Sequence, residues 1–348
     1  MNKKMKAYRI YGPLDMRLEE IDIPTINDNE VLIKVAYSGI CTTDRELYDG
    51  TMPYFAQGLS KRPMTAGHEW AGIVAKVGKA VQDVKPGDLV VGDISVGCGK
   101  CTNCLKGLYH LCANRTELGV IRYDGSFAEY LKTEGKNVYK VPAGVSAKEA
   151  ALVEPLATVL NAVRRTGINP GDNVIVFGDG PIGLLNAQLA NHCGAAQVIV
   201  VGIKDAHQEK IEKWGLKFIN SSKVNLEEEI IRIFGAKGDI IFEDTGNAAT
   251  FDTAVKSVKP GGKICALSIT GAPTIPVNLD YIVTRDITVV GVLASPNSFL
   301  PALQMIAAKK VDVAGCISHE YSFENAVEAF ELVRGSTTDR IKVLVKGL

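Results

Sequence analysis

The chain has 348 residues, of which 46% are hydrophobic and 22% charged, with 39 basic and 39 acidic side chains. This length exceeds what one hydrophobic core usually serves, so two domains are expected. Balanced charge argues against binding nucleic acid or an anionic membrane surface by bulk electrostatics. No apolar run reaches the roughly 18 residues of a membrane span or forms a signal peptide, so a soluble, cytoplasmic protein with a small-molecule partner is expected.

The first part of the chain, from Met5 to about Leu152, alternates short strand-like segments with glycine turns. Val31, Ile33 and Val35 alternate as in a half-buried strand, and Lys85-Pro86-Gly87-Asp88 is typical of a turn. This part therefore predicts a mostly β domain.

A cysteine cluster interrupts this domain at about residues 95–115. Four of the eight cysteines lie close together in the pattern Cys98-x2-Cys101-x2-Cys104-x7-Cys112. In a reducing compartment such clustering indicates metal more than disulfides. Four thiolates fill every position of a tetrahedral zinc ion, so the spacing predicts a closed, structural zinc site, with a redox pair or a disulfide cluster as the alternative.

The second part of the chain alternates apolar runs with amphipathic segments. This pattern predicts a parallel sheet covered by helices, that is, a doubly wound α/β domain. The expected strands are 174–177, 198–201, 240–242, 264–267 and 287–292, and the expected helices are 182–192, 206–214, 226–234 and 249–258.

A glycine-rich turn follows the first of these strands, in the segment Gly178-x-Gly180-Pro181-Ile182-Gly183. The bare pattern is weak evidence of function. Between a predicted strand and a predicted helix, however, it supplies the tight turn and the helix N-terminus that bind the pyrophosphate of a dinucleotide.

The end of the chain returns to helical patterns at 299–309 and 323–333 and finishes with a strand-like run at 341–345. So short a tail is expected to pack back on the first domain.

Three further motifs carry reactive side chains: Cys41-x-Thr43-Asp44, Gly67-His68-Glu69 and Glu154-Pro155. A lone histidine or cysteine is more often a core residue than a ligand. None of these motifs is convincing alone.

The order of these motifs resembles the zinc-containing medium-chain dehydrogenase/reductase family, which includes alcohol, sorbitol and threonine dehydrogenases. The resemblance covers essentially the whole chain. It implies a GroES-like, mostly β catalytic domain at 1–155, a Rossmann domain with a doubly wound parallel sheet at 156–293, and a return to the catalytic domain at 294–348.

The resemblance also implies roles for residues. Cys41 and His68 match the ligands of a catalytic zinc, and Glu69 and Glu154 are the two acidic candidates for its remaining contacts. Thr43 would relay the departing proton, and Asp44 would orient His68. Such a zinc lowers the pKa of a substrate hydroxyl so that hydride can leave to the nicotinamide.

Two positions bear on the substrate. Alcohol dehydrogenases carry a cysteine at the Glu154 position, so this glutamate resembles the polyol, glucose and threonine branch. Glu46 stands where alcohol dehydrogenases often have a relay histidine; it either takes part in proton exit, binds substrate hydroxyls, or is a solvated surface residue. Asp93 is a further polar residue expected near the substrate.

The cofactor is expected to be NAD or NADP. Gly202 stands where strict NAD enzymes have a ribose-binding carboxylate, and Lys204 nearby would tolerate a 2′-phosphate. Asp205 could instead bind the ribose. These residues slightly favour NADP.

The sequence thus predicts an enzyme with one catalytic and one structural zinc that oxidises a secondary hydroxyl of a polyol, sugar or cyclitol. A threonine-type amino-alcohol dehydrogenase is the alternative, followed by a non-catalytic binding or regulatory protein on the same scaffold. A homodimer or homotetramer is expected, in which the run at 287–292 extends a sheet across a two-fold axis.

Overall fold

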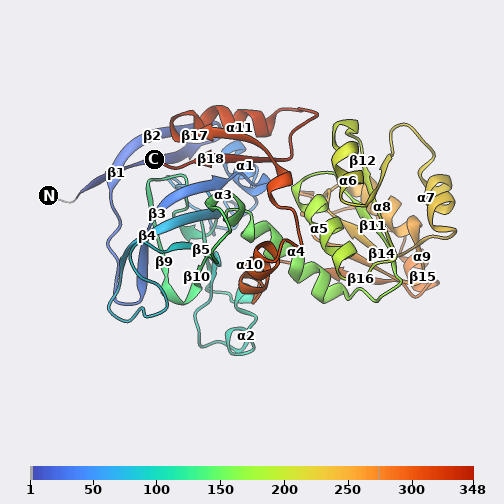
Figure 1. Cartoon of the computed structure of the whole chain (residues 1–348), viewed down its shortest axis with the longest axis horizontal. Helices are drawn as coiled ribbons and strands as arrows, with labels where there is room; N and C mark the ends of the chain where they lie inside the picture. Colours follow the sequence, from blue (N-terminus) through green and yellow to red (C-terminus); the bar gives the residue numbers. More distant parts are fainter. Residues whose placement is uncertain (1–2, 273) are drawn as a thin grey trace. The chain divides into compact units, whose positions relative to one another are not determined.

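The computed structural model describes residues 3–272 and 274–348 and divides the chain into two compact units (Figure 1). Unit 1 contains the residues up to Ala157 together with Ala294–Lys309 and Ile317–Leu348. Unit 2 contains Thr158–Leu293 and Lys310–Cys316. None of the described helices is long and apolar enough to cross a lipid bilayer.

Unit 1 is mostly β, as the strand-and-turn pattern predicts. Its main sheet has seven strands in the order β10-β5-β4-β3-β18-β17, and β9 also pairs with β3. The members of this sheet are β3 (Glu30–Gly39), β4 (Glu69–Val77), β5 (Leu89–Gly92), β9 (Tyr130–Glu134), β10 (Val138–Lys140), β17 (Ile317–Ser322) and β18 (Lys342–Lys346). Smaller sheets are formed by β1 (Lys4–Gly12) with β2 (Asp15–Asp22), and by β6 (Ser95–Val96), β7 (Thr116–Leu118) and β8 (Arg122–Tyr123).

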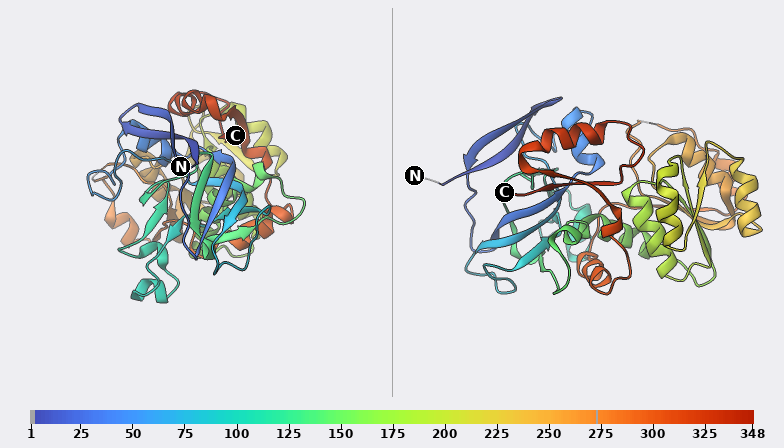
Figure 2. Two further views of the ribbon diagram at one scale, coloured as in Figure 1. Left: turned by 90° about the vertical axis from the view of Figure 1, so that its left-hand side faces the viewer. Right: turned by 45° about the horizontal axis from the view of Figure 1, so that its top comes forward.

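The helices of unit 1 bring together segments from opposite ends of the sequence. Helix α11 (Ala326–Arg334) packs beside α1 (Thr42–Asp49), and the rings of Tyr48 and Phe330 meet edge to face with centroids 5.5 Å apart (Figure 2). The last strand, β18, pairs antiparallel with β3, so the tail does return to the first domain. The helices are α1 (Thr42–Asp49), α2 (Thr102–Leu105), α3 (Ala147–Ala150), α4 (Val153–Thr166, which continues into unit 2), α10 (Phe299–Ala307) and α11 (Ala326–Arg334).

Unit 2 is a doubly wound domain built on six parallel strands in the order β13-β12-β11-β14-β15-β16. Its central strands are apolar throughout because helices flank the sheet. The strands are β11 (Asn173–Phe177), β12 (Gln197–Gly202), β13 (Lys217–Asn220), β14 (Gly238–Glu243), β15 (Val258–Ala266) and β16 (Thr288–Gly291). The helices are α5 (Pro181–His192), α6 (Gln208–Lys213), α7 (Leu226–Phe234), α8 (Ala248–Ser257) and α9 (Leu279–Val283).

The structure contains several elements that the sequence pattern did not predict, among them helices α1 and α4, and it moves one boundary. Strands β13 and β17 and helix α9 have only four to six residues each, too few to show a clear period. The tail also does not belong wholly to unit 1. Residues 310–316 join unit 2, where Asp312 accepts a hydrogen bond from Trp214 and its N–H donates to Gln188 at 2.7 Å.

Candidate functional site

Three potential metal ligands meet in unit 1 where β3 ends and β4 begins. The ligand atoms of Cys41, His68 and Glu69 all lie within 4.8 Å of one another. Cys41 directly precedes α1, and His68 directly precedes β4. Glu69 is the first residue of β4 and pairs with Gly39 at the end of β3. His68 and Glu69 are buried. A thiol, an imidazole and a carboxylate in this arrangement suit a zinc ion with an open fourth position.

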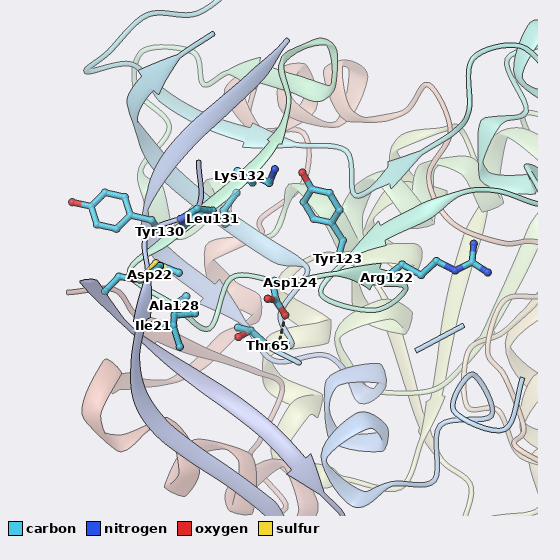
Figure 3. A pocket seen from close by; sticks show the side chains of 13 residues that line it. Ile21, Asp22, Thr65, Arg122, Tyr123, Asp124, Ala128, Tyr130, Leu131 and Lys132 are labelled. Carbon is cyan, nitrogen blue, oxygen red and sulfur yellow. Dashed lines mark hydrogen bonds between the residues drawn. The ribbon is translucent and has the colours of Figure 1, made fainter. Parts of the chain in front are cut away.

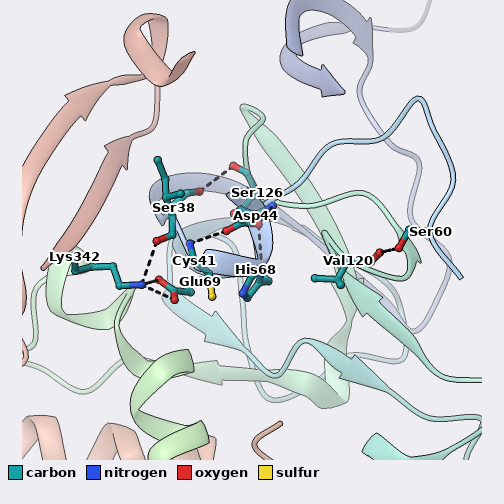
Figure 4. A network of polar contacts seen from close by, with 11 residues as sticks. Ser38, Cys41, Asp44, Ser60, His68, Glu69, Val120, Ser126 and Lys342 are labelled. Atoms are coloured by element: carbon teal, nitrogen blue, oxygen red, sulfur yellow. Dashed lines mark hydrogen bonds and ion pairs between the residues drawn. The ribbon is translucent and has the colours of Figure 1, made fainter. Parts of the chain in front are cut away.

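The carboxylate of Asp44 organises this cluster (Figure 4). It is fully buried, and it accepts hydrogen bonds from the N–H groups of Cys41 at 2.9 Å and Gly67 at 3.0 Å. The same carboxylate lies 3.1 Å from Nδ1 of His68. With Nδ1 donating to Asp44, Nε2 of His68 has its lone pair available for a metal.

The protonation of His68 depends on its two neighbours. Burial alone lowers the pKa of His68, but the negative charges of Asp44 and Cys41 raise it well above its usual range. A metal ion binds only the neutral ring, so metal binding at this cluster would release that proton.

Lys342, which belongs to none of the sequence motifs, completes the cluster. Its ammonium donates to both carboxylate oxygens of Glu69, at 2.6 and 2.7 Å, and to the carbonyl of Ile40 at 3.3 Å (Figure 4). Lys342 is 3% exposed. Burial lowers the pKa of Lys342, but the negative charges of Glu69 and Cys41 raise it by more, so the pKa is raised overall. The sequence signal was a charged residue inside the apolar run 341–345.

Glu154 lies close to the same cluster, in the first turn of α4, but is not one of the three residues whose ligand atoms come within 4.8 Å. The pKa of Glu154 is raised to about 7, mainly by burial; Glu69 and Asp93 add to the rise, and His68 and Lys342 oppose it. The position of the three-residue cluster favours Glu69 over Glu154 as the direct carboxylate ligand.

Thr43 and Glu46 lie on α1, immediately after Cys41. Burial raises the pKa of Glu46, Asp49 raises it as well, and Arg45 opposes the rise. Within the described residues, neither side chain forms a hydrogen bond with Cys41, His68 or Glu69. Glu46 is therefore a partly desolvated carboxyl group close to the cluster in sequence.

The four cysteines of the second motif converge as the spacing predicts. The sulfur atoms of Cys98, Cys101, Cys104 and Cys112 lie within 4.8 Å of one another, and none of the four forms a disulfide. Hydrogen bonds from the N–H groups of Lys100 and Cys101 lower the pKa of Cys98 to about 6, and burial raises that of Cys104 to about 11. Four sulfur donors around one point fit a tetrahedral zinc ion.

Asp93 connects this cysteine lobe to the main sheet. Its buried carboxylate accepts a hydrogen bond from the hydroxyl of Tyr109, a residue of the lobe, and another from the N–H of Ser95. Burial raises the pKa of Asp93 to about 6. Its two bonds hold the lobe in place.

The glycine-rich turn of unit 2 joins β11 to α5. Gly180 is the N-cap of α5, and Pro181 and Ile182 are its first residues. A Cβ atom on Gly183 would lie 2.8 Å from the carbonyl carbon of Gly178 and closer still to the carbonyl oxygen. Only glycine therefore allows this close packing. The free N–H groups at the start of α5 can bind a pyrophosphate.

The residues predicted to select the cofactor lie after β12. Gly202 is the last residue of this strand and is buried. Asp205 is hydrogen-bonded by Asn220 at 2.7 Å and paired with Lys223. The backbone N–H of Lys204 donates to Asp179, a residue of the glycine-rich turn that the sequence analysis did not consider.

A cavity of about 290 Å³ elsewhere in unit 1 is unrelated to these residues (Figure 3). It lies beside the β1–β2 hairpin and β9, and its lining includes Ile21, Tyr123, Tyr130 and Lys132. None of the predicted site residues lines it.

Comparison with known proteins identifies the family of the chain. Residues 27–143 match the alcohol dehydrogenase GroES-like domain, and residues 181–329 match the zinc-binding dehydrogenase domain. The chain is 32% identical to sorbitol dehydrogenase of Bacillus subtilis, over 99% of this chain and 97% of that protein. It is 34% identical to L-threonine 3-dehydrogenase of Bacillus velezensis, over 96% and 97%.

Among solved structures, a putative zinc-binding dehydrogenase from Sinorhizobium meliloti, bound to NADP, superposes with a TM-score of 0.92. The two sequences are 30% identical, and the match covers 99% of this chain and 100% of the other. The doubly wound unit and the mostly β unit are therefore shared with that protein.

The ion pair between Glu69 and Lys342 gives a test of the site's architecture. Lys342→Met leaves a buried carboxylate without its partner, which we expect to lower the free energy of unfolding by about 3–5 kcal/mol. The loss should be smaller in the double variant Lys342→Met/Glu69→Gln, since no unpaired charge remains. Urea unfolding measures both.

Lys346→Met is the matched control, because Lys346 lies on the same strand but is exposed. An equal loss of stability in the control, or a double variant less stable than Lys342→Met, would contradict a buried, paired Glu69.

Proposed function

Because the chain belongs to the zinc-containing medium-chain dehydrogenase/reductase family, we propose that it transfers hydride between NAD(P) and a secondary hydroxyl of a polyol, sugar or cyclitol. The observation that carries this proposal is the buried cluster of one sulfur, one imidazole and one carboxylate at Cys41, His68 and Glu69. This cluster offers one sulfur donor, whereas a cysteine-rich site offers several. A zinc ion bound here would therefore be a stronger Lewis acid for a hydroxyl substrate.

We propose two zinc ions per chain, one at this cluster and one at the four cysteines. Both donor sets fit zinc in type and number, and the four-cysteine set leaves no position for a substrate. Glu154 interacts electrostatically with His68 and Glu69 and is a candidate for the fourth contact of the first zinc. The catalytic zinc, when bound, would polarise a substrate hydroxyl.

The protein's own groups have supporting roles in this proposal. Asp44 fixes the orientation of His68 through Nδ1. Thr43, two residues after Cys41, would pass the substrate proton outward, and Glu46 either accepts it or binds further hydroxyls. Lys342 holds the Glu69 carboxylate in place and offsets its charge.

The relatives leave a second candidate substrate. The chain is 34% identical to a threonine dehydrogenase and 32% identical to a sorbitol dehydrogenase, and both kinds of substrate carry a secondary hydroxyl. An amino-alcohol substrate would also need groups in the site that bind its ammonium and its carboxylate.

A substrate panel tests the function. Zinc-loaded protein should reduce NAD or NADP with at least one of sorbitol, xylitol, glucose or the inositols, and more slowly with threonine. Cys41→Ser should lower kcat at least 100-fold, because it removes a ligand of the catalytic cluster. Cys193→Ser, at an exposed cysteine in unit 2, should leave kcat unchanged.

Turnover of threonine alone would favour the amino-alcohol alternative. No turnover on the whole panel, or equal activity of Cys41→Ser, would count against the proposal.

We also propose that the chain forms a homodimer or homotetramer. Strand β16 lies at one edge of the six-stranded sheet, and Val289 on it is 43% exposed. An open apolar edge strand is suited to pairing with its equivalent in a second copy.

Light scattering should give a mass of twice or four times that of the monomer, and Val290→Pro should lower the measured mass. A monomeric mass for the unmodified chain would refute the association.

A further inference from the structure

The end of strand β12 lacks a side chain, yet a carboxylate occupies the space beside it. A Cβ atom on Gly202 would lie 2.6 Å from Cβ of Asp179 and as close to its carboxyl group. Asp179 belongs to the glycine-rich turn between β11 and α5. The carboxyl group that is missing from the strand end is therefore present, supplied by the neighbouring turn.

Hydrogen bonds fix the position of this carboxylate. Oδ2 of Asp179 accepts from the N–H of Ile203 at 3.1 Å and from the N–H of Lys204 at 2.9 Å. The carbonyl of Asp179 lies 2.9 Å from Nδ1 of the buried His207. Asp179 is 7% exposed. Two backbone N–H groups that a phosphate would otherwise use are thus already bonded to an anion.

We propose that Asp179 replaces the strand-end carboxylate and makes the protein prefer NAD to NADP; this inference rests on the proposed dehydrogenase function. In doubly wound domains the adenosine ribose binds at the end of this strand, where a carboxylate accepts hydrogen bonds from its hydroxyls. The same carboxylate repels the charge of a 2′-phosphate in a partly desolvated site.

The nearby cations do not reverse this preference. Lys223 is paired with Asp205, which Asn220 also holds at 2.7 Å. Lys204 and Lys223 together only balance Asp179 and Asp205, so these four side chains leave no excess positive charge for a phosphate. The slight preference for NADP was predicted from Gly202 and Lys204, that is, from the strand and the residues that follow it. That prediction did not include Asp179, which lies in the neighbouring turn.

Binding of reduced cofactors tests the proposal independently of any substrate. Fluorescence titration of the zinc-loaded protein should show NADH binding at least 10-fold more tightly than NADPH. Asp179→Ala should reduce this ratio at least 10-fold, because it removes the charge and frees the two N–H groups.

A double variant separates specificity from a structural role. Gly202 does not have a positive φ, and the three atoms nearest to a Cβ there all belong to the side chain of Asp179, so a side chain fits once residue 179 is glycine. Asp179→Gly/Gly202→Asp moves the carboxylate back to the strand end and should restore the preference for NADH. Glu209→Gln, which removes an exposed carboxylate from α6, is the matched control and should leave the ratio unchanged.

Equal affinities of the unmodified protein for NADH and NADPH would overturn the proposal. So would an Asp179→Ala variant that weakens both equally, since that result indicates a structural role only. Binding of neither nucleotide would overturn the proposed function as well. A preserved NADH preference without turnover of any substrate would support the role of Asp179 while the substrate assignment fails.

Discussion

A buried ion pair between Glu69 and Lys342 ties the last strand of the chain to the candidate zinc site. The two residues are 273 positions apart in sequence, and both are nearly inaccessible to solvent. A buried charge is costly unless it is paired, and the ammonium of Lys342 offsets the charge of the Glu69 carboxylate inside the domain. The tail must therefore return to the first unit, where β18 pairs with β3.

The rest of the site is assembled from local structure. Asp44 lies in the first turn of α1, so its carboxylate reaches back to the N–H of Cys41 and across to His68. One short helix thus fixes the direction of both the sulfur and the imidazole. Local order of this kind places the ligands before any metal binds, which lowers the conformational entropy lost on binding.

The sequence was sufficient to predict those parts of the site that depend on a short motif or on the family resemblance. The four cysteines converge within one lobe, the glycine-rich turn joins the predicted strand and helix, and Cys41, His68 and Glu69 meet where the resemblance placed them. The β-α alternation also predicted the order of most elements in unit 2, because amphipathic helices and apolar strands have distinct periods.

Partners that depend on tertiary contact could not be predicted in this way. Lys342 reaches Glu69 only because β18 pairs with β3, and Asp179 fills the space beside Gly202 only because β11 and β12 are neighbours in the sheet. In both cases a charged residue inside an apolar or glycine-rich motif was the visible signal. Its partner became clear only in the folded chain.

The donor set of the catalytic cluster is the central claim, and X-ray absorption at the zinc edge tests it most directly. Cys104→Ser removes a ligand of the four-cysteine site, so the variant should retain about one zinc ion per chain. That ion should have one sulfur neighbour at about 2.3 Å and nitrogen or oxygen neighbours at about 2.0–2.2 Å. A remaining zinc with two or more sulfur neighbours, or no remaining zinc, would contradict a site built from Cys41, His68 and Glu69.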